Sequence, residues 1–314
     1  MENLIFSFNA TLPIFFTMLL GLFFRKIGLM DEAFVKRMNQ FVFVAALPAL
    51  LFEDLSTVDF VRAWDTRFVL FCFFVTLLSI GLTVLLSFFL KDRSAQGEFV
   101  QASYRSSAAI LGIAFIQNIY GDAGMAPLMI VGTVPLYNVM AVVVLSFLKP
   151  DRGRLDRKLV LKTLKGIVTN PILLGIAAGL LWSALRLPMP AILEKTVHNV
   201  AVLATPLGLM AMGGSLEFKK ALGRIGPAAA ASFIKLIGLA ALFLPAAVFL
   251  GFTREKLVAI LVMLGSATTV SCFVMAKNMG HEGTLTSSAV MLTTLGSAFT
   301  LTGWLFLLRT AGLI

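Results

Sequence analysis

Long apolar runs, separated by short charged breaks or breaks marked by glycine and proline, are the main pattern of this chain. The run from Phe68 to Leu90 has 23 residues and no charge. About 20 apolar residues in helical conformation cross the hydrocarbon core of a bilayer. Runs of this kind predict ten spanning helices, near residues 5–24, 38–53, 68–90, 101–120, 124–148, 163–185, 197–216, 225–251, 257–276 and 285–308. The predicted fold class is an all-α membrane protein.

Composition supports the same interpretation. The chain is 59% hydrophobic and 13% charged, with a mean hydropathy of +0.94, which is far more apolar than an ordinary water-soluble domain. Its two cysteines, Cys72 and Cys272, fall inside apolar runs, so we expect neither a disulfide framework nor a thiolate metal site. No sequence feature indicates a cofactor.

The net charge of +10 indicates the orientation of the chain in the membrane rather than nucleic-acid binding, because the basic residues lie in clusters between the apolar runs. With the N-terminus outside, 18 Lys and Arg residues, Arg105 among them, fall on the cytoplasmic side and seven on the outer side. The positive-inside rule therefore predicts a multi-pass protein of the cell (inner) membrane with both termini outside. Its expected partner is the lipid bilayer, not nucleic acid.

The chain also resembles itself at an offset of 158 residues. At this offset Pro13 coincides with Pro171, and Pro48 coincides with Pro206. Proline makes up only 11 of the 314 residues, so these two matches carry more weight than the apolar matches around them. The offset predicts an internal repeat.

Each half of this repeat holds five predicted spans. Residues 1–150 form the first five-helix repeat, 151–162 a cytoplasmic linker and 163–314 the second repeat, with Gly21 of one half matched by Gly179 of the other. An odd number of spans makes the second half enter the bilayer in the opposite direction, so the halves are expected to be inverted. Inverted repeats are a recurring construction of secondary transporters. A duplication kept only for folding is the alternative.

Small polar residues occur at mid-depth in the fourth and ninth predicted spans. They predict that both helices break there and cross, so that half-helix N-termini and hydroxyl groups face an anionic group. The alternative is that small residues only allow close helix packing. The candidate substrate-binding residues are Ser106, Ser107, Ser266, Thr268, Thr269 and Ser271.

Lys235 is the one charged residue that the predicted boundaries place well inside a span, roughly 16 Å along the helix from Arg224. It could attract a carboxylate, or it could neutralise half-helix C-termini and stabilise the crossing. All Asp and Glu residues fall at predicted span ends or in loops, which argues against a carboxylate-based cation centre. Asn138, in the fifth span, is a further candidate ligand whose alternative role is an interhelical hydrogen bond.

Several short motifs resemble the auxin efflux carrier family, which includes plant auxin exporters and bacterial carriers of malonate or malate. The resemblance covers nearly the whole chain. It rests on Leu12-Pro13 with Gly21, Ala46-Leu47-Pro48, Val134 to Val139, Thr169-Asn170-Pro171, Lys235 with Pro245, Ser271 through Lys277, and Thr293-Thr294-Leu295. The bacterial branch is the more similar one.

The resemblance implies ten helices in two inverted five-helix repeats, with a scaffold part and a transport part whose fourth and ninth helices cross near the substrate. Asn and Pro often mark those crossings in the family. In this chain Ser107, Ala114 and Ser266 occupy the corresponding places.

The resulting hypothesis is a secondary transporter that moves a small organic anion, such as a carboxylate or an auxin-like acid, by alternating access. A sodium-coupled symporter of a related fold and a membrane receptor that does not transport are the alternatives. Enzyme activity is not expected, because the two histidines are far apart and no cysteine or aspartate has a suitable spacing to either. The sequence leaves a homodimer open.

Overall fold

The computed structural model of the chain describes residues 16–56, 65–108, 124–149, 168–215 and 224–314, with a few single positions between these ranges. Every regular element within them is helical, which confirms the predicted all-α class. The predicted linker lies outside the described residues.

Residues 16–26 are helical, and the later elements follow in chain order. They are α2 (Glu32–Phe41), η1 (Val42–Ala46), α3 (Leu47–Ser56), α4 (Thr66–Ser87), η2 (Arg93–Ala95), α5 (Gln96–Tyr104), α7 (Ala126–Phe147), α9 (Pro171–Ala184), α10 (Ala191–Ala201), α11 (Ala204–Gly214), α13 (Ile225–Phe233), η4 (Ile234–Gly238), α14 (Leu239–Phe249), α15 (Arg254–Gly265), α16 (Ser271–Asn278) and α17 (Thr284–Thr310).

Six helices among the described residues are long and apolar enough to cross a membrane. They are Glu32–Ser56, Thr66–Ser87, Ala126–Phe147, Ala191–Gly214, Ile225–Phe249 and Thr284–Thr310. The sixth predicted span corresponds to the shorter helix α9, and the ninth is divided between α15 and α16. The ten-helix arrangement stays a prediction.

Local sequence explains where several of these helices begin. The side chains of Asp31, Asp65 and Asn170 accept hydrogen bonds from the first-turn amides of α2, α4 and α9. Asx side chains are favoured at this position because they satisfy N–H groups that have no partner within the helix. In α9 the next residue is Pro171, whose missing N–H costs nothing at the first helical position.

The long helix formed by α2, η1 and α3 changes its hydrogen-bond pattern in the middle. Residues Val42–Ala46 form a π-helical turn, and the amide of Leu47 donates to the carbonyl of Val42. Pro48 follows at once and has no N–H for the carbonyl four residues earlier. A local shift to the wider π pattern accommodates this missing donor.

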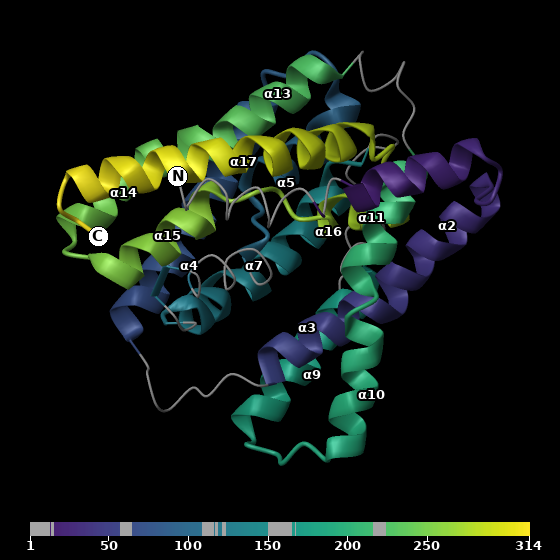
Figure 1. Cartoon of the computed structure of the whole chain (residues 1–314), viewed down its shortest axis with the longest axis horizontal. Coiled ribbons are helices and arrows are strands. Elements are labelled where there is room, and N and C mark those ends of the chain that lie inside the picture. Colours follow the sequence, from purple (N-terminus) through teal and green to yellow (C-terminus); the bar gives the residue numbers. More distant parts are fainter. Residues whose placement is uncertain are drawn as a thin grey trace.

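The helices divide into two groups, each with most of its contacts inside the group (Figure 1). The first helix group contains residues 16–26, α2, η1, α3, α9, α10 and α11. The second helix group contains α4, α5, α7, α13, η4, α14, α15, α16 and α17. Contacts between the groups are fewer and run mainly through α16 and α7.

Glycines let helices of the first helix group approach backbone to backbone. A Cβ atom on Gly21 would lie 2.2 Å from the carbonyl oxygen of Met210, and one on Gly179 would lie 2.9 Å from that of Phe52. Gly179 and Met210 follow Gly21 and Phe52 by the same 158 residues. The same close approach therefore occurs twice. The glycine comes from the first half of the chain in one contact and from the second half in the other.

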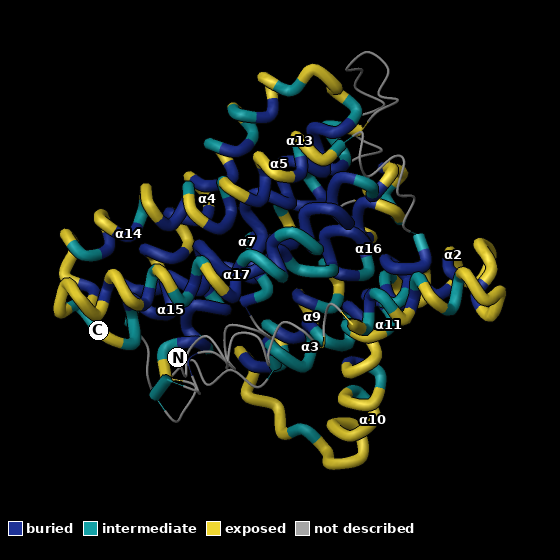
Figure 2. The backbone as a smooth tube through the Cα atoms, turned by 45° about the horizontal axis from the view of Figure 1, so that its top comes forward, coloured by how far each residue is buried: buried dark blue, intermediate teal, exposed yellow. Residues whose placement is uncertain are grey.

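Burial differs sharply across the molecule. Within the second helix group, helices α5, α7, α15 and α16 are mostly buried, whereas α10 of the first helix group is largely exposed (Figure 2). Large apolar side chains also cover the outer surface, including Phe249, Phe89 and Ile192, each at least 84% exposed. Extensive apolar surface is characteristic of a protein that faces lipid or another apolar partner.

Candidate functional site

Two helices of the second helix group break and meet at the same place. Helix α5 ends at Tyr104 and helix α15 ends at Gly265, and the next residues of both are extended. Ser106 and Thr268 form an antiparallel bridge, in which the amide of Ser107 donates to the carbonyl of Ala267 at 2.9 Å. Both helices therefore end at the small polar residues that predicted a break, although no proline lies there, and most of the fourth predicted span beyond Ala108 lies outside the described residues.

A cavity lies at this crossing, between the two helix groups. The second helix group contributes the crossing segments, α7, α16 and α17, and the first contributes α3 and α11. The polar residues that line it are Asp54, Arg105, Ser106, Ser107, Tyr137, Asn138, Thr205, Thr268, Thr269, Ser271 and Thr294. The apolar lining includes Leu47, Leu50, Leu51, Val134, Val270 and Val274.

Arg105 is the cationic side chain in this lining, and only 2% of its surface is exposed. Its guanidinium donates to Asn138 Oδ1 at 2.8 Å and to Ser271 Oγ at 3.0 Å. The other contacts are to Met275 Sδ at 2.9 Å and Gln101 Oε1 at 3.4 Å, and the Nε–H has no partner in the described part of the chain. Every acceptor is neutral, so the buried charge has no counter-ion among the described residues.

The placement of Arg105 corrects two sequence predictions. Arg105 does not lie at the cytoplasmic surface, where the charge count put it, and Lys235 is not the only charge deep inside a span. The predicted fourth span began at residue 101, whereas α5 begins at residue 96 and 3₁₀ turn η2 precedes it. Because α5 begins earlier than predicted, Arg105 directly follows the C-terminal end of α5 and lies where the helix breaks.

Lys235 lies outside the cavity lining, in the π-helical turn η4. Its ammonium group donates to the carbonyls of Met263 and Leu264, in the last turn of α15. A cation at a helix C-terminus interacts favourably with carbonyls that have no donor within the helix and with the helix dipole. Of the two roles that the sequence left open, the contacts favour stabilisation of the crossing.

Six of the predicted site residues line the cavity, namely Ser106, Ser107, Asn138, Thr268, Thr269 and Ser271. Some of their polar groups already form hydrogen bonds within the protein. Thr268 Oγ1 donates to the carbonyl of Ala102 at 2.8 Å, and Ser106 Oγ donates to that of Met263. These hydroxyls hold the crossing together as well as facing the cavity.

Ser266 differs from the predicted arrangement. Ser266 is fully buried and absent from the cavity lining, and its Oγ has no partner among the described residues. In the first turn of α16 the amides of Cys272 and Phe273 donate to the carbonyls of Thr269 and Val270. The side chain of Arg105 adds a positive charge to the cavity lining beside this half-helix N-terminus, whose role in substrate binding stays a prediction.

Two carboxyl groups in terminal turns of helices are fully or partly buried. Glu98, in α5, is fully buried, and its carboxylate accepts from the amides of Gly283 at 2.9 Å and Thr286 at 3.0 Å. It thereby stabilises the N-terminus of α17, where a negative charge is favoured. Asp54, in α3, is half-buried and lines the cavity from the first helix group. Glu98 lies in the first turn of α5, so its burial is compatible with the expectation that the carboxylates lie at helix ends or in loops.

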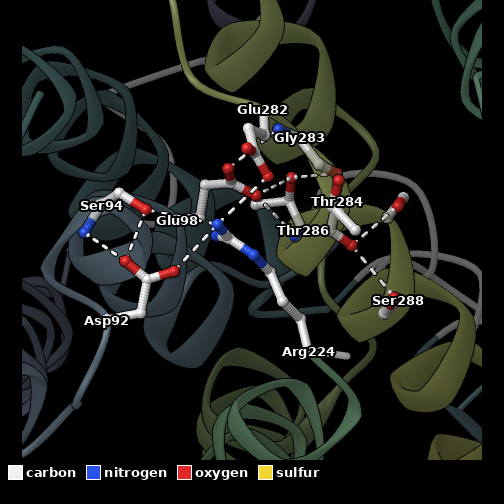
Figure 3. Close-up of polar contacts among 10 residues, drawn as sticks. Asp92, Ser94, Glu98, Arg224, Glu282, Gly283, Thr284, Thr286 and Ser288 are labelled. Atoms are coloured by element: carbon white, nitrogen blue, oxygen red, sulfur yellow. Dashed lines mark hydrogen bonds and ion pairs between the residues drawn. The ribbon is translucent and has the colours of Figure 1, made fainter. Parts of the chain in front are cut away.

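An ion-pair cluster surrounds the Glu98 contact at one end of the second helix group (Figure 3). The guanidinium of Arg224 lies 2.9 Å from a carboxylate oxygen of Asp92 and 3.1 Å from one of Glu282. Hydrogen bonds from Ser94, together with the charge of Arg224, hold the pKa of the Asp92 carboxyl below its usual range. The cluster joins three chain segments that precede α5, α13 and α17.

The same end of the molecule contains a buried histidine. His281 Nε2 lies 2.9 Å from the carbonyl of Leu145, and Nδ1 has no partner in the described part of the chain. Burial lowers the pKa of His281 below its ordinary value. No group of three or more His, Cys, Asp or Glu residues suited to a metal ion occurs within the described ranges.

Comparison with known proteins supplies a family. A family model described as membrane transport protein matches residues 6–305, almost the whole chain. The match confirms the family resemblance found in the sequence motifs. No curated protein matches the chain.

Proposed function

Because the chain belongs to the membrane transport protein family, we propose that it is a secondary transporter that moves a small organic anion across the cell membrane by alternating access. The observation that carries this proposal is the cavity between the two helix groups, with the buried Arg105 in its lining. A buried cation without a counter-ion is costly, and an anionic ligand in the cavity compensates its charge.

The arrangement of the two groups supports alternating access. The cavity wall is formed partly by α3 and α11 and partly by the crossing segments, while contacts between the groups are sparse elsewhere. A relative movement of the groups changes the side from which such a cavity is open. The first helix group, with its close glycine contacts, is the proposed scaffold part, and the second is the proposed transport part.

Repeated spacing supports the inverted-repeat part of the proposal. Helices α10, α13 and α17 begin 159, 159 and 158 residues after α2, α4 and α7. The pair Gly21 and Met210 recurs as Gly179 and Phe52 with the halves exchanged. Two related halves can pack in two alternative ways around one central site, which is the basis of the rocking movement in such carriers.

Counterflow in proteoliposomes tests this function. Vesicles that contain the purified protein and are loaded with an unlabelled carboxylate are expected to accumulate the labelled acid, whereas protein-free vesicles are not. A panel of mono- and dicarboxylates run with and without sodium separates a sodium-coupled carrier from an uncoupled one. Saturable carboxylate binding with no counterflow would instead identify a receptor, and the absence of both would overturn the proposal.

A further inference from the structure

We propose that α16 is a gate that closes one end of the cavity by packing against α2, η1 and α11, and that the contact between Asn278 and Asn39 sets how readily this gate opens. The inference rests on the proposed alternating access and deepens it by naming the contact that has to break. The residues of this interface, which we call the gate seam, are Asn39, Val42, Gly208, Val270, Val274 and Asn278.

Cavity and seam follow one another in the same order along two helices. On the long helix formed by α2, η1 and α3, Leu47 and Leu51 line the cavity, whereas Asn39 contacts α16. Asn39 precedes Leu47 by eight residues, or roughly 12 Å along the helix axis. On α16, Val274 lines the cavity and Asn278, one turn later, contacts α2. Helix α16 therefore covers the cavity at the end where α2 lies.

Helix α11 completes the seam, and Figure 1 shows it beside α16 and α2. Thr205 of α11 lines the cavity, and Gly208 follows one turn later. A Cβ atom on Gly208 would lie 3.0 Å from Val270 Cγ1, 3.5 Å from Val274 Cγ2 and 3.8 Å from Val42 Cγ1. Because Gly208 has no side chain, α11 packs directly on the two valines of the cavity wall. A substrate can pass this end only after α16 separates from the first helix group.

The polar contact across the seam is a weak one. Asn278 Nδ2 donates to the main-chain carbonyl of Asn39 at 3.3 Å and to that of Val274, within its own helix, at 2.8 Å. Only the longer of these two bonds joins the two helix groups. A single hydrogen bond contributes little net free energy, because water replaces it when it breaks. The seam can therefore open at a small cost from this bond.

The side chain of Asn39 acts in the opposite direction. Asn39 is buried, and its Oδ1 atom has no partner among the described residues. A buried acceptor without a donor costs free energy, and water can satisfy it once α16 moves away. The main chain of Asn39 thus favours the closed seam, whereas its side chain disfavours it. Such a balance suits a contact that has to close and open in every transport cycle.

Thiol labelling of Val42→Cys tests this balance, in a background that lacks the two native cysteines. Val42 is fully buried, so its replacement reacts with a maleimide only when the seam is open. Asn278→Ala is expected to raise the labelling rate of the purified protein about two- to tenfold, the effect of one lost hydrogen bond. Asn39→Leu keeps the carbonyl that accepts from Asn278 and removes the unpaired acceptor, so it should lower the rate by a similar factor.

Asn199→Ala, an exposed change of the same kind in α10, is the matched control and should leave the labelling rate unchanged. A general loss of stability would raise the rate in both seam variants. Changes in the same direction for Asn278→Ala and Asn39→Leu would therefore refute the gate. If Asn39→Leu does not fold, as judged by size-exclusion chromatography, Asn278→Ala must still raise the rate, and an unchanged rate would refute the closing contact.

Cross-linking tests whether the seam has to open during transport. The double variant Asn39→Cys/Asn278→Cys, treated with a short thiol reagent that reduction cleaves, is expected to lose counterflow and to regain it on reduction. The control pair Glu53→Cys/His198→Cys lies within the first helix group, where His198 Nδ1 is 2.8 Å from Glu53 Oε1. Its cross-link should leave counterflow unchanged.

The outcomes separate this inference from the proposed function. If the cross-linked seam variant still shows full counterflow, the gate is refuted and the transport of an organic anion stands. If no carboxylate gives counterflow even with the wild-type protein, the proposed function fails. The labelling rates then still decide whether α16 separates from α2, because they do not depend on a substrate.

Discussion

Arg105 and Lys235 are both buried cations near the helix crossing, yet their surroundings differ in kind. The Lys235 ammonium group contacts main-chain carbonyls at the end of α15, where the helix itself provides negative potential. The Arg105 guanidinium contacts four neutral side chains and lines a cavity. A buried cation at a helix C-terminus stabilises the fold, whereas one with neutral partners and an unpaired donor is available to a ligand.

The sharpest test of this difference is Arg105→Gln, which should have the largest effect on transport. Carboxylate flux is expected to fall on the order of a hundredfold, because the substrate loses its buried cationic partner. The unfolding temperature should not fall, since the variant no longer buries a charge without a counter-ion. Flux in proteoliposomes and thermal unfolding in detergent measure the two effects. A large loss of stability with normal flux per folded molecule would contradict the assignment.

Lys235→Met should show the opposite result. The carbonyl of Leu264 loses the donor that the structure assigns to it, and the crossing is destabilised by about 1–3 kcal/mol. Unfolding in denaturant, followed by intrinsic tryptophan fluorescence, measures this loss. The folded fraction should bind carboxylate with wild-type affinity, and a loss of affinity as large as that of Arg105→Gln would remove the distinction between the two cations.

Glu98→Gln extends the comparison to a buried anion. Glu98 contacts the amides at the N-terminus of α17, as Lys235 contacts the carbonyls at the C-terminus of α15. Replacing the carboxylate by an amide should cost about 1 kcal/mol, because charge-assisted hydrogen bonds weaken and the favourable interaction with the helix dipole is lost. The same denaturation experiment tests this value. Thr310→Val, an exposed change in the same helix, is the control.

The smallest expected effect is a pH dependence from His281, which lies close to Glu98 and Lys149. Its pKa is lowered by burial from an ordinary value of 6.5. Just below pH 6.5 the unfolded chain therefore binds a proton that the folded chain does not, and stability decreases as the pH falls. The contribution is at most about 1.4 kcal/mol per pH unit. His281→Gln should reduce this slope between pH 6.5 and 5, and an unchanged slope would assign it to other groups.

The parts of the site that the sequence predicted are those with a local signal. Small polar residues around Ser107 and Thr268 indicated two helix breaks, because such residues tolerate extended backbone and provide hydrogen bonds at depth. The repeat offset predicted that these two segments are counterparts. Their pairing through Ser107 and Ala267 agrees with that expectation.

The role of Arg105 was missed, because it depends on where a helix starts. A span that began at residue 101, as predicted, would place Arg105 near the membrane surface. Because α5 begins at residue 96, Arg105 instead lies at the crossing. The contact of Glu98 with Gly283 joins residues 185 positions apart, and no local pattern marks it. A sequence signal did exist for Arg105, which directly precedes the two serines of the predicted break.

The crossing itself is joined by main-chain atoms, since the amide of Ser107 bonds to the carbonyl of Ala267. Such a bond depends little on which side chains the two residues carry. Substitutions of wall residues whose side chains do not bond across the crossing, such as Leu50 and Val134, can therefore alter which acid is accepted while the framework that presents it is preserved. This separation provides a route by which new substrate preferences can evolve through single replacements, without a new fold.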